Sequence, residues 1–224
     1  MARINLERRA EIGREKRART RAQIVEAGTM LLAERPLEAL TVDAVVDAAG
    51  VAKGTFYYHF QSMEELAAAV GEKLGESFDE LLGPARLGLR DPIARLSFAF
   101  TQFLEKAIAD PVWARLVVQS AQAPTEFAPS PRAHLKTDLS EAQAQGRLTV
   151  QDVELAADIG LGILLGVMRG TLQRRATPDV VRQALDAGLR ALGASPARER
   201  EDGLTDSARG AVAGARRAVR VASS

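Results

Sequence analysis

The sequence has no cysteine and few aromatic residues, and both absences narrow what the protein can be. Without cysteine, disulfides, thiolate metal sites and cysteine nucleophiles are excluded. Phe, Trp and Tyr together make up 4% of the chain, so each aromatic residue is informative. No window holds the run of about 18 apolar residues that a membrane-spanning helix needs, and residues 1–20 lack the apolar centre of a secretory signal. We therefore expect a soluble, cytoplasmic protein with no membrane partner.

The net charge of +1 hides an uneven distribution of charge along the chain. Residues 1–21 contain eight basic and three acidic side chains, and residues 1–19 are predicted to form a basic N-terminal arm. Such an arm favours a polyanionic partner, because clustered Lys and Arg side chains attract phosphate groups. A solvated tail without a function fits the same composition.

Helix-forming residues dominate the rest of the sequence, which predicts an all-α fold. Hydrophobic residues make up 46% of the chain and charged residues 26%, as in an average globular protein. No alternating run of β-branched residues indicates a strand. Residues 194–224, rich in Ala, Arg, Gly and Ser, are predicted to be a flexible tail. Helices are predicted over about 20–34, 41–50, 53–59, 62–82, 133–145, 153–175 and 178–192, and two more begin at the Asp-Pro pairs 91–92 and 110–111.

Two of the short predicted helices, 41–50 and 53–59, are joined by a tight turn at Gly50, as in a helix-turn-helix. Glycine suits this turn because helix ends often need a left-handed backbone conformation. The same geometry also fits ordinary helical packing. DNA binding is favoured by the second helix, where Phe56 and Phe60 can anchor the inner face while the outer face is polar or amphipathic, with Lys53, Thr55, Tyr57, Tyr58 and His59.

The segment from Thr41 to Leu66, TVDAVVDAAGVAKGTFYYHFQSMEEL, resembles the DNA-binding segment of the TetR family of regulators. The close match covers about residues 24–70. The resemblance implies a helix-turn-helix DNA-binding domain over 20–65 and a helical ligand-binding and dimerisation domain over 66–193. It also implies that base edges are contacted by Lys53, Gly54, Thr55 and Tyr58, and phosphates by Thr41, Tyr57 and His59.

Two positions depart from the family pattern. Ala52 stands where many members have a serine that caps the recognition helix, and Met63 stands where many have a lysine that reaches a phosphate. The basic arm is expected to compensate for the missing lysine. The departures lend some support to an alternative, a helical small-molecule-binding or scaffolding protein of the same fold that no longer reads DNA. The alternative is opposed by the retention of Lys53, Tyr57, Tyr58 and His59. Taken alone, a histidine such as His59 is also common as an ordinary surface residue.

The region after residue 66 contains no catalytic set, since His134 is its only histidine and no paired base or nucleophile is found. We predict that the protein is not an enzyme and uses no cofactor or metal. The resemblance implies a repressor that a hydrophobic or amphipathic small molecule releases from operator DNA. Large residues that would line the ligand cavity, or alternatively form ordinary core, are Phe98, Phe103, Trp113, Leu116, Gln119, Phe127 and Met168.

The last two predicted helices have features of an interface. Glycines at 162, 166 and 170 recur every four residues, which lets another helix approach closely. Residues 156–168 are apolar nearly all round, which predicts burial on more than one side. The family pairs these helices in a four-helix bundle, so the resemblance implies a homodimer, while packing within one chain is the alternative. A dimer would place two recognition helices about 34–36 Å apart, on successive major grooves.

Overall fold

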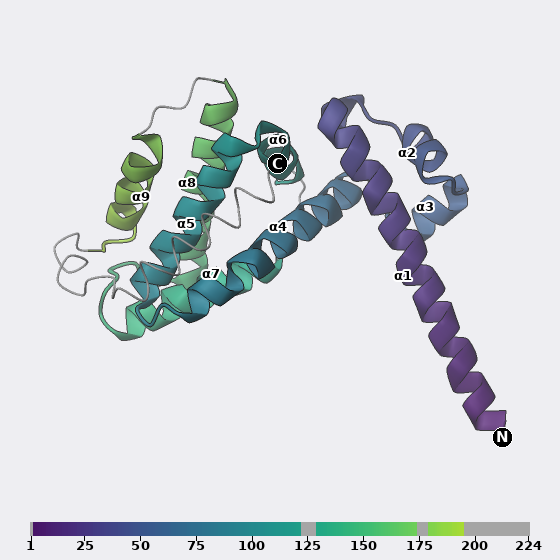
Figure 1. Cartoon of the computed structure of the whole chain (residues 1–224), viewed down its shortest axis with the longest axis horizontal. Coiled ribbons are helices and arrows are strands. Elements are labelled where there is room, and N and C mark those ends of the chain that lie inside the picture. Colours follow the sequence, from purple (N-terminus) through teal and green to yellow (C-terminus); the bar gives the residue numbers. More distant parts are fainter. Residues whose placement is uncertain (1, 122–128, 174–178, 195–224) are drawn as a thin grey trace.

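The computed structural model describes residues 2–121, 129–173 and 179–194, and every secondary-structure element in these residues is helical (Figure 1). The all-α prediction is confirmed. Phe127 and residues 195–224 lie outside the described residues. The elements are α1 (Ala2–Glu34), a short 3₁₀ helix (Leu37–Ala39), α2 (Val42–Ala49), α3 (Lys53–His59), α4 (Met63–Leu87), α5 (Pro92–Ala109), α6 (Pro111–Ser120), α7 (Pro129–Ala144), α8 (Val153–Gln173) and α9 (Val180–Ala191).

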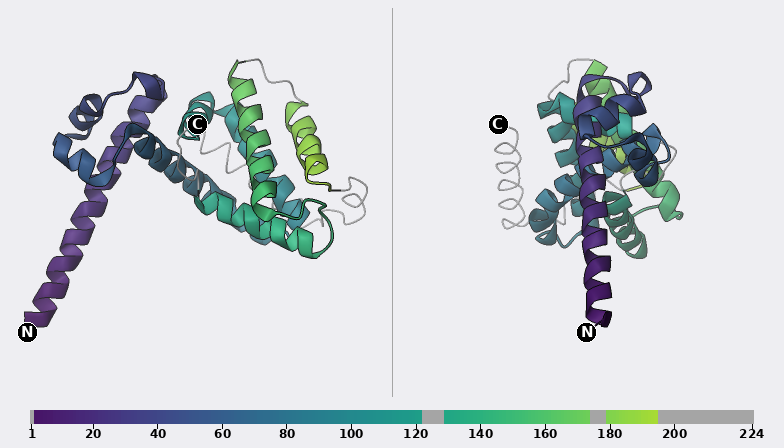
Figure 2. Two further views of the ribbon diagram at one scale, coloured as in Figure 1. Left: turned by 180° about the vertical axis from the view of Figure 1, so that it is seen from behind. Right: turned by 90° about the vertical axis from the view of Figure 1, so that its right-hand side faces the viewer.

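The molecule has two parts, and α4 runs from one into the other (Figure 1). Helices α1 to α3 and the start of α4 form the smaller part, and the rest of α4 lies along one side of the larger part, where it contacts α5, α6 and α7. The N-terminal half of α1 projects away from both parts, as both views of Figure 2 show. This arrangement leaves the outer side of α1 to α3 open to a large partner.

Helix α1 begins at Ala2, whereas the sequence predicts a helix only from Thr20. The predicted basic arm is therefore part of a continuous helix. Its residues are mostly Ala, Arg, Glu and Lys, which are strong helix formers, and Glu15 lies four residues before Arg19, a spacing that supports a helix. The prediction missed this helix because it relied on an apolar stripe, and residues 8–19 are almost all exposed.

The smaller part is held together by a core that α1, α2, α3 and α4 share. Phe56 of α3 and Phe60, which follows this helix as its C-cap, are fully buried. Ile24 of α1 and Leu66 of α4 are buried with them. Each buried side chain of this size contributes about 1.5–3 kcal/mol. This core fixes α3 against α1, so the orientation of its outer face is set by the packing of its inner face.

Helix α4 continues through Pro84 to Leu87, beyond the end near residue 82 that the sequence predicts. Proline in a helix removes one backbone hydrogen bond and normally kinks or ends the helix. Here the turn after Pro84 is tied down by Arg86, which donates to Asp79 at 3.2 Å and to Asp138 of α7 at 2.7 Å. Helix α7 begins at Pro129, before the predicted residue 133, and its early prolines lie in the first turn, where their missing N–H groups cost little.

Helix α8 is less buried in the single chain than its composition predicts. Only Ala156, Ala157 and Met168 are buried among its residues, and Leu155 is 51% exposed. By length and composition, α8 is the one helix among the described residues that is apolar enough to cross a membrane, although only 22% of its most apolar stretch is buried here. The prediction of burial on several sides is thus wrong for one chain alone.

Candidate DNA-binding surface and ligand cavity

The turn between α2 and α3 is built by local capping. Thr41 is the N-cap of α2, and its side-chain oxygen accepts a hydrogen bond from Ala44 N–H at 3.2 Å. Gly50 ends α2 in the left-handed conformation, with φ of 65°, as the sequence predicts. The exposed Thr41 hydroxyl keeps its own proton, so it remains a donor at the edge of the turn.

The outer face of α3 presents polar and aromatic groups to solvent. Tyr57 is 51% exposed and Tyr58 is 68% exposed, whereas the adjacent Phe56 is fully buried. A Cβ atom built on Gly54 would meet no neighbouring atom within 4 Å, so the backbone is open there. This face can contact a surface closely, which is what major-groove recognition by a helix requires.

Lys53, at the start of α3, is held by an acidic neighbour. Its Nζ atom lies 2.8 Å from Oδ1 of Asp43 in α2, and this hydrogen bond raises the pKa of Lys53. Both side chains are largely exposed, at 53% and 70%. In the free protein the ammonium group is thus paired with a carboxylate, and DNA would have to compete for it.

His59, at the end of α3, lies near basic side chains of α1. Partial burial, followed by the guanidinium groups of Arg21 and Arg17, lowers the pKa of His59. Arg21 also lies over the Phe60 ring, 5.0 Å from its centroid. The end of α3 and the middle of α1 therefore form one surface with two cations and an imidazole.

The structure shows what Ala52 and Met63 do at the two positions that depart from the family pattern. Ala52 is the N-cap of α3, and no side chain caps the helix there. The next helix, α4, is capped by Ser62, whose side chain accepts from Glu65 N–H at 3.2 Å, while the Glu65 carboxylate accepts from Gln61 N–H at 2.7 Å. Met63 packs against the core of the smaller part, so it takes an apolar role.

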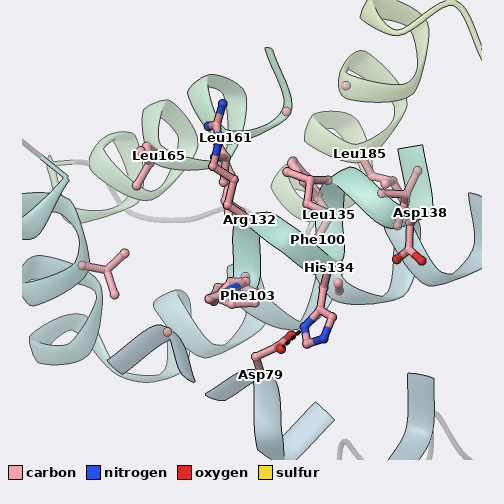
Figure 3. Close-up of a pocket in the computed structure, with 18 of the residues that line it drawn as sticks. Asp79, Phe100, Phe103, Arg132, His134, Leu135, Asp138, Leu161, Leu165 and Leu185 are labelled. Carbon is pink, nitrogen blue, oxygen red and sulfur yellow. Dashed lines mark hydrogen bonds and ion pairs between the residues drawn. The ribbon is translucent and has the colours of Figure 1, made fainter. Parts of the chain in front are cut away.

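The larger part contains an apolar cavity of about 120 Å³ between α4, α5, α7, α8 and α9 (Figure 3). Phe100 and Phe103 of α5 lie on one side, and leucines of α8 and α9 lie on others. Glycines at 71 and 75 of α4 leave room along its wall. The apolar lining comprises Leu96, Ala99, Phe100, Phe103, Val117, Pro131, Leu135, Leu161, Leu164, Leu165, Leu185, Leu189 and Leu192.

One side of the cavity is polar, and we call Asp79, Arg86, His134 and Asp138 the polar wall. His134 Nδ1 lies 2.5 Å from Oδ2 of Asp79, the contact dashed in Figure 3. Asp138 also accepts from Arg95 of α5, at 2.6 Å. The same four residues line a second, open groove on the outer side, so the wall separates the cavity from solvent.

Most of the large residues that the sequence offers for the cavity do not line it. Of the six candidates that the structure describes, only Phe103 does. Phe98, Trp113 and Met168 belong to the adjacent core, where the Trp113 ring lies 5.9 Å from Phe103 and 5.3 Å from Phe78. Leu116 belongs to the core of the smaller part. Gln119 lies away from the cavity, and its buried Oε1 has no hydrogen-bond partner among the described residues. Phe127 lies outside the described residues.

Sequence reasoning missed the polar wall. His134 was the one available signal, as the single histidine of this region, but no spacing links it to Asp79, which is 55 residues away. Over the described ranges, no group of His, Asp and Glu side chains is arranged to hold a metal ion.

Comparison with known proteins finds relatives of the DNA-binding part in sequence. Residues 24–70 match the model of bacterial regulatory proteins of the tetR family. The chain is 39% identical over 66 residues to the transcriptional repressor KstR2 of Rhodococcus jostii, and 35% identical over 68 residues to the transcriptional regulator TtgR of Pseudomonas putida. These matches cover 30% of this chain and 31% and 32% of the two relatives, so the likeness in sequence lies in the DNA-binding part.

The whole fold also has solved counterparts. The structure of RolR in complex with resorcinol matches with a TM-score of 0.67 and 25% identity, over 88% of this chain and 95% of RolR. This match includes both the helix-turn-helix part and the part that holds the cavity. The helix-turn-helix part thus matches the tetR family of bacterial regulatory proteins, and the helical fold of the whole chain is similar to that of RolR.

Proposed function

We propose that the protein is a homodimeric transcriptional repressor that binds operator DNA and is released by a small molecule bound in the cavity. The observation that carries the DNA-binding role is the outer face of α3. Tyr57 and Tyr58 are exposed, whereas Phe56 of the same helix and Phe60 at its C-cap are fully buried. Leaving two large aromatic side chains exposed to water, side by side, is unusual in a chain with so few of them.

The expected DNA contacts follow from the groups on this face. Lys53, Gly54, Thr55 and Tyr58 lie at the groove-facing side in this proposal, and an ammonium group at Lys53 suits the acceptor atoms of guanine. Thr41, Tyr57 and His59 are proposed to contact phosphates. When DNA binds, the Lys53 ammonium group breaks its ion pair with Asp43. A DNA site that offers this ammonium group no better acceptor is therefore disfavoured.

The basic extension of α1 is proposed to add phosphate contacts. Arg8, Arg9, Arg14 and Lys16 are exposed on a helix that projects beyond α3 (Figure 2). A rigid helix holds these charges at fixed positions, whereas a flexible tail would spread them. Such contacts strengthen binding without reading sequence.

Two helices connect the cavity to the DNA-binding part. Helix α4 carries Asp79 in the polar wall and Leu66 in the DNA-binding core. Helix α6 carries Trp113 beside Phe103 of the cavity and, one turn later, Leu116 in that same core. A ligand that shifts α4 or α6 would therefore change the position of α3, which is the coupling that release requires.

Dimerisation through α8 and α9 is proposed from the uncovered face of α8. A Cβ atom on Gly162 or Gly166 would meet no neighbouring atom within 4 Å, so this part of the glycine stripe faces open space in one chain. Glycine costs a helix interior about 1 kcal/mol relative to alanine, which calls for a packing partner. A second copy would cover this stripe and the exposed Leu155.

The RolR structure was solved with resorcinol, and this likeness supports a small-molecule effector for the present chain. The cavity supports the same proposal, since it is apolar with a few convergent polar groups, as small-molecule sites usually are.

The test is selection of bound duplexes from a random pool with the full chain, followed by titration of the selected duplex at two salt concentrations. Enrichment of a palindrome, with the preference at one base pair relaxed by Lys53→Ala, is the expected result. Enrichment of nothing above salt-sensitive background would refute DNA reading and favour a small-molecule-binding protein of the same fold.

A further inference from the structure

The size of the cavity restricts its ligand to a small one. Its volume of about 120 Å³ is close to that of engineered apolar cavities of about 150 Å³, which bind benzene. Two phenylalanines and several leucines contribute most of the lining, and Phe103 continues into an aromatic cluster with Phe78, at 4.8 Å, and Trp113. A single aromatic ring fits both the space and the lining.

The charges around the cavity are already balanced. Arg86 is paired with Asp79 and Asp138, and Arg132 is paired with Glu154 at 3.1 Å and Asp158 at 2.8 Å. Each arginine among the described lining residues is thus already paired with two carboxylates. A carboxylate ligand would lose its hydration on entering the cavity without gaining an unpaired cation, and this loss is costly.

An ammonium ligand would likewise find only carboxylates that are already paired with cations. Asp79 is held by Arg86 and His134, and Asp138 is held by Arg86 and Arg95. Each carboxylate of the polar wall thus already has two partners. A charged group of either sign gains little here, so a neutral ligand is favoured.

The polar wall has hydrogen-bonding capacity left in two places. The Nε atom of Arg86 is buried and has no hydrogen-bond partner in the described part of the chain. His134 binds Asp79 through Nδ1 only, so its Nδ1 carries the proton and its Nε2 is an acceptor in the neutral ring. A group that accepts from an N–H and donates to an imidazole nitrogen would satisfy both, and a hydroxyl does this.

We infer that the cavity binds a neutral, single-ring phenol, with the ring against Phe100 and Phe103 and the hydroxyl at the polar wall. The inference rests on the proposed function only in taking the cavity as the effector site. The hydroxyl would accept from Arg86 and donate to His134, and both residues connect α4 with α7. A ligand held this way bears directly on α4, which leads to the DNA-binding core.

The experiment measures binding to the full chain by titration calorimetry without DNA, using phenol, benzene, benzoate and cyclohexanol as probes. Phenol is expected to bind at least about tenfold more tightly than benzene, since benzene leaves the buried donor of the polar wall without a partner. Benzoate is expected to bind more weakly than phenol because its charge has no free counterion. Cyclohexanol carries the same hydroxyl on a thicker, non-aromatic ring and is expected to bind more weakly too.

A substitution tests the polar wall itself. His134 is 54% exposed, so His134→Leu should fold, and it should reduce the advantage of phenol over benzene by roughly fivefold, as expected for one hydrogen bond. Ser140→Leu, at an exposed position of α7 away from the cavity, is the matched control and should leave the ratio unchanged.

Several outcomes would overturn the inference. Benzene equal to phenol would remove the role of the polar wall, benzoate tighter than phenol would show that a cation is available, and cyclohexanol equal to phenol would exclude an aromatic preference. Binding of none of the four probes would reject a phenol site. These results are independent of DNA, so a chain that binds phenol but selects no duplex would contradict the proposed function and leave this inference standing.

Discussion

Replacing Ala52 with serine should stabilise the recognition helix, because α3 begins without a side-chain cap. The backbone is already suited to one: Ala52 has φ of −75° and ψ of 151°, close to Asp91, which caps α5 at φ of −79° and ψ of 125°. A serine oxygen at position 52 would accept from the N–H group of Gly54 or Thr55, as Ser62 does for α4.

The expected gain is about 1 kcal/mol, the typical value for a capping serine in place of alanine. The upper end of the observed range, about 2 kcal/mol, is not expected. Thr55 N–H already bonds to the Ala52 carbonyl at 2.8 Å, so the new cap would share a donor that is not fully free. For a protein of this size, a stabilisation of about 1 kcal/mol raises the Tm by about 2–4 °C.

Thermal unfolding followed by circular dichroism, with urea unfolding as a second measurement, checks this value. The control is Ala133→Ser at an exposed position inside α7, where serine should cost up to about 0.7 kcal/mol because it has no cap to make. Equal shifts for the two variants, or a lower Tm for Ala52→Ser, would refute the reasoning that α3 lacks a cap at Ala52.

Three further predictions concern DNA binding and assembly. The pKa of His59 is lowered in the free protein, whereas a bound phosphate favours the protonated ring, so DNA binding takes up a proton. Operator affinity should therefore rise as the pH falls from about 7.5 to about 5.5. A His59→Gln variant with the same pH profile would contradict this. Deletion of residues 2–18 should make the plot of log affinity against log salt shallower by about 0.9 for each phosphate that the α1 extension neutralises, measured by fluorescence anisotropy, and an unchanged slope would exclude a role for this extension. Gly166→Leu should give a folded monomer in sedimentation equilibrium, because the added side chain meets open space in one chain but would block the close approach of a second helix. A dimer as tight as the wild type would place the interface elsewhere.

The helix-turn-helix could be predicted from sequence because its signals are local. The cap at Thr41, the left-handed glycine at 50 and the four-residue spacing of Phe56 and Phe60 each act within one or two turns, and the structure contains all three. The length of α1 was not predictable from the apolar pattern, since residues 8–19 are almost all exposed and show no apolar stripe.

The cavity could not be predicted in the same way. Phe98 and Phe103 are five residues apart on α5, and which of them faces the cavity depends on how α5 is rotated against α4 and α7. Leu116 is apolar and lies in the cavity-bearing half of the sequence, yet the packing of α6 against α1 places it in the DNA-binding core. The contact between His134 and Asp79 joins residues far apart in the chain, and only the assembled helices bring them together.

The continuity of α4 has a consequence for engineering. Chimaeric regulators are made by joining the DNA-binding part of one protein to the sensing part of another, and the join is usually sought where two domains meet. In this protein residues 63–87 form one helix that contributes to both parts, so no such boundary exists within it. A hybrid that keeps α4 whole, and takes α6 with it because Leu116 packs into the DNA-binding core, would preserve the connection between sensor and reader.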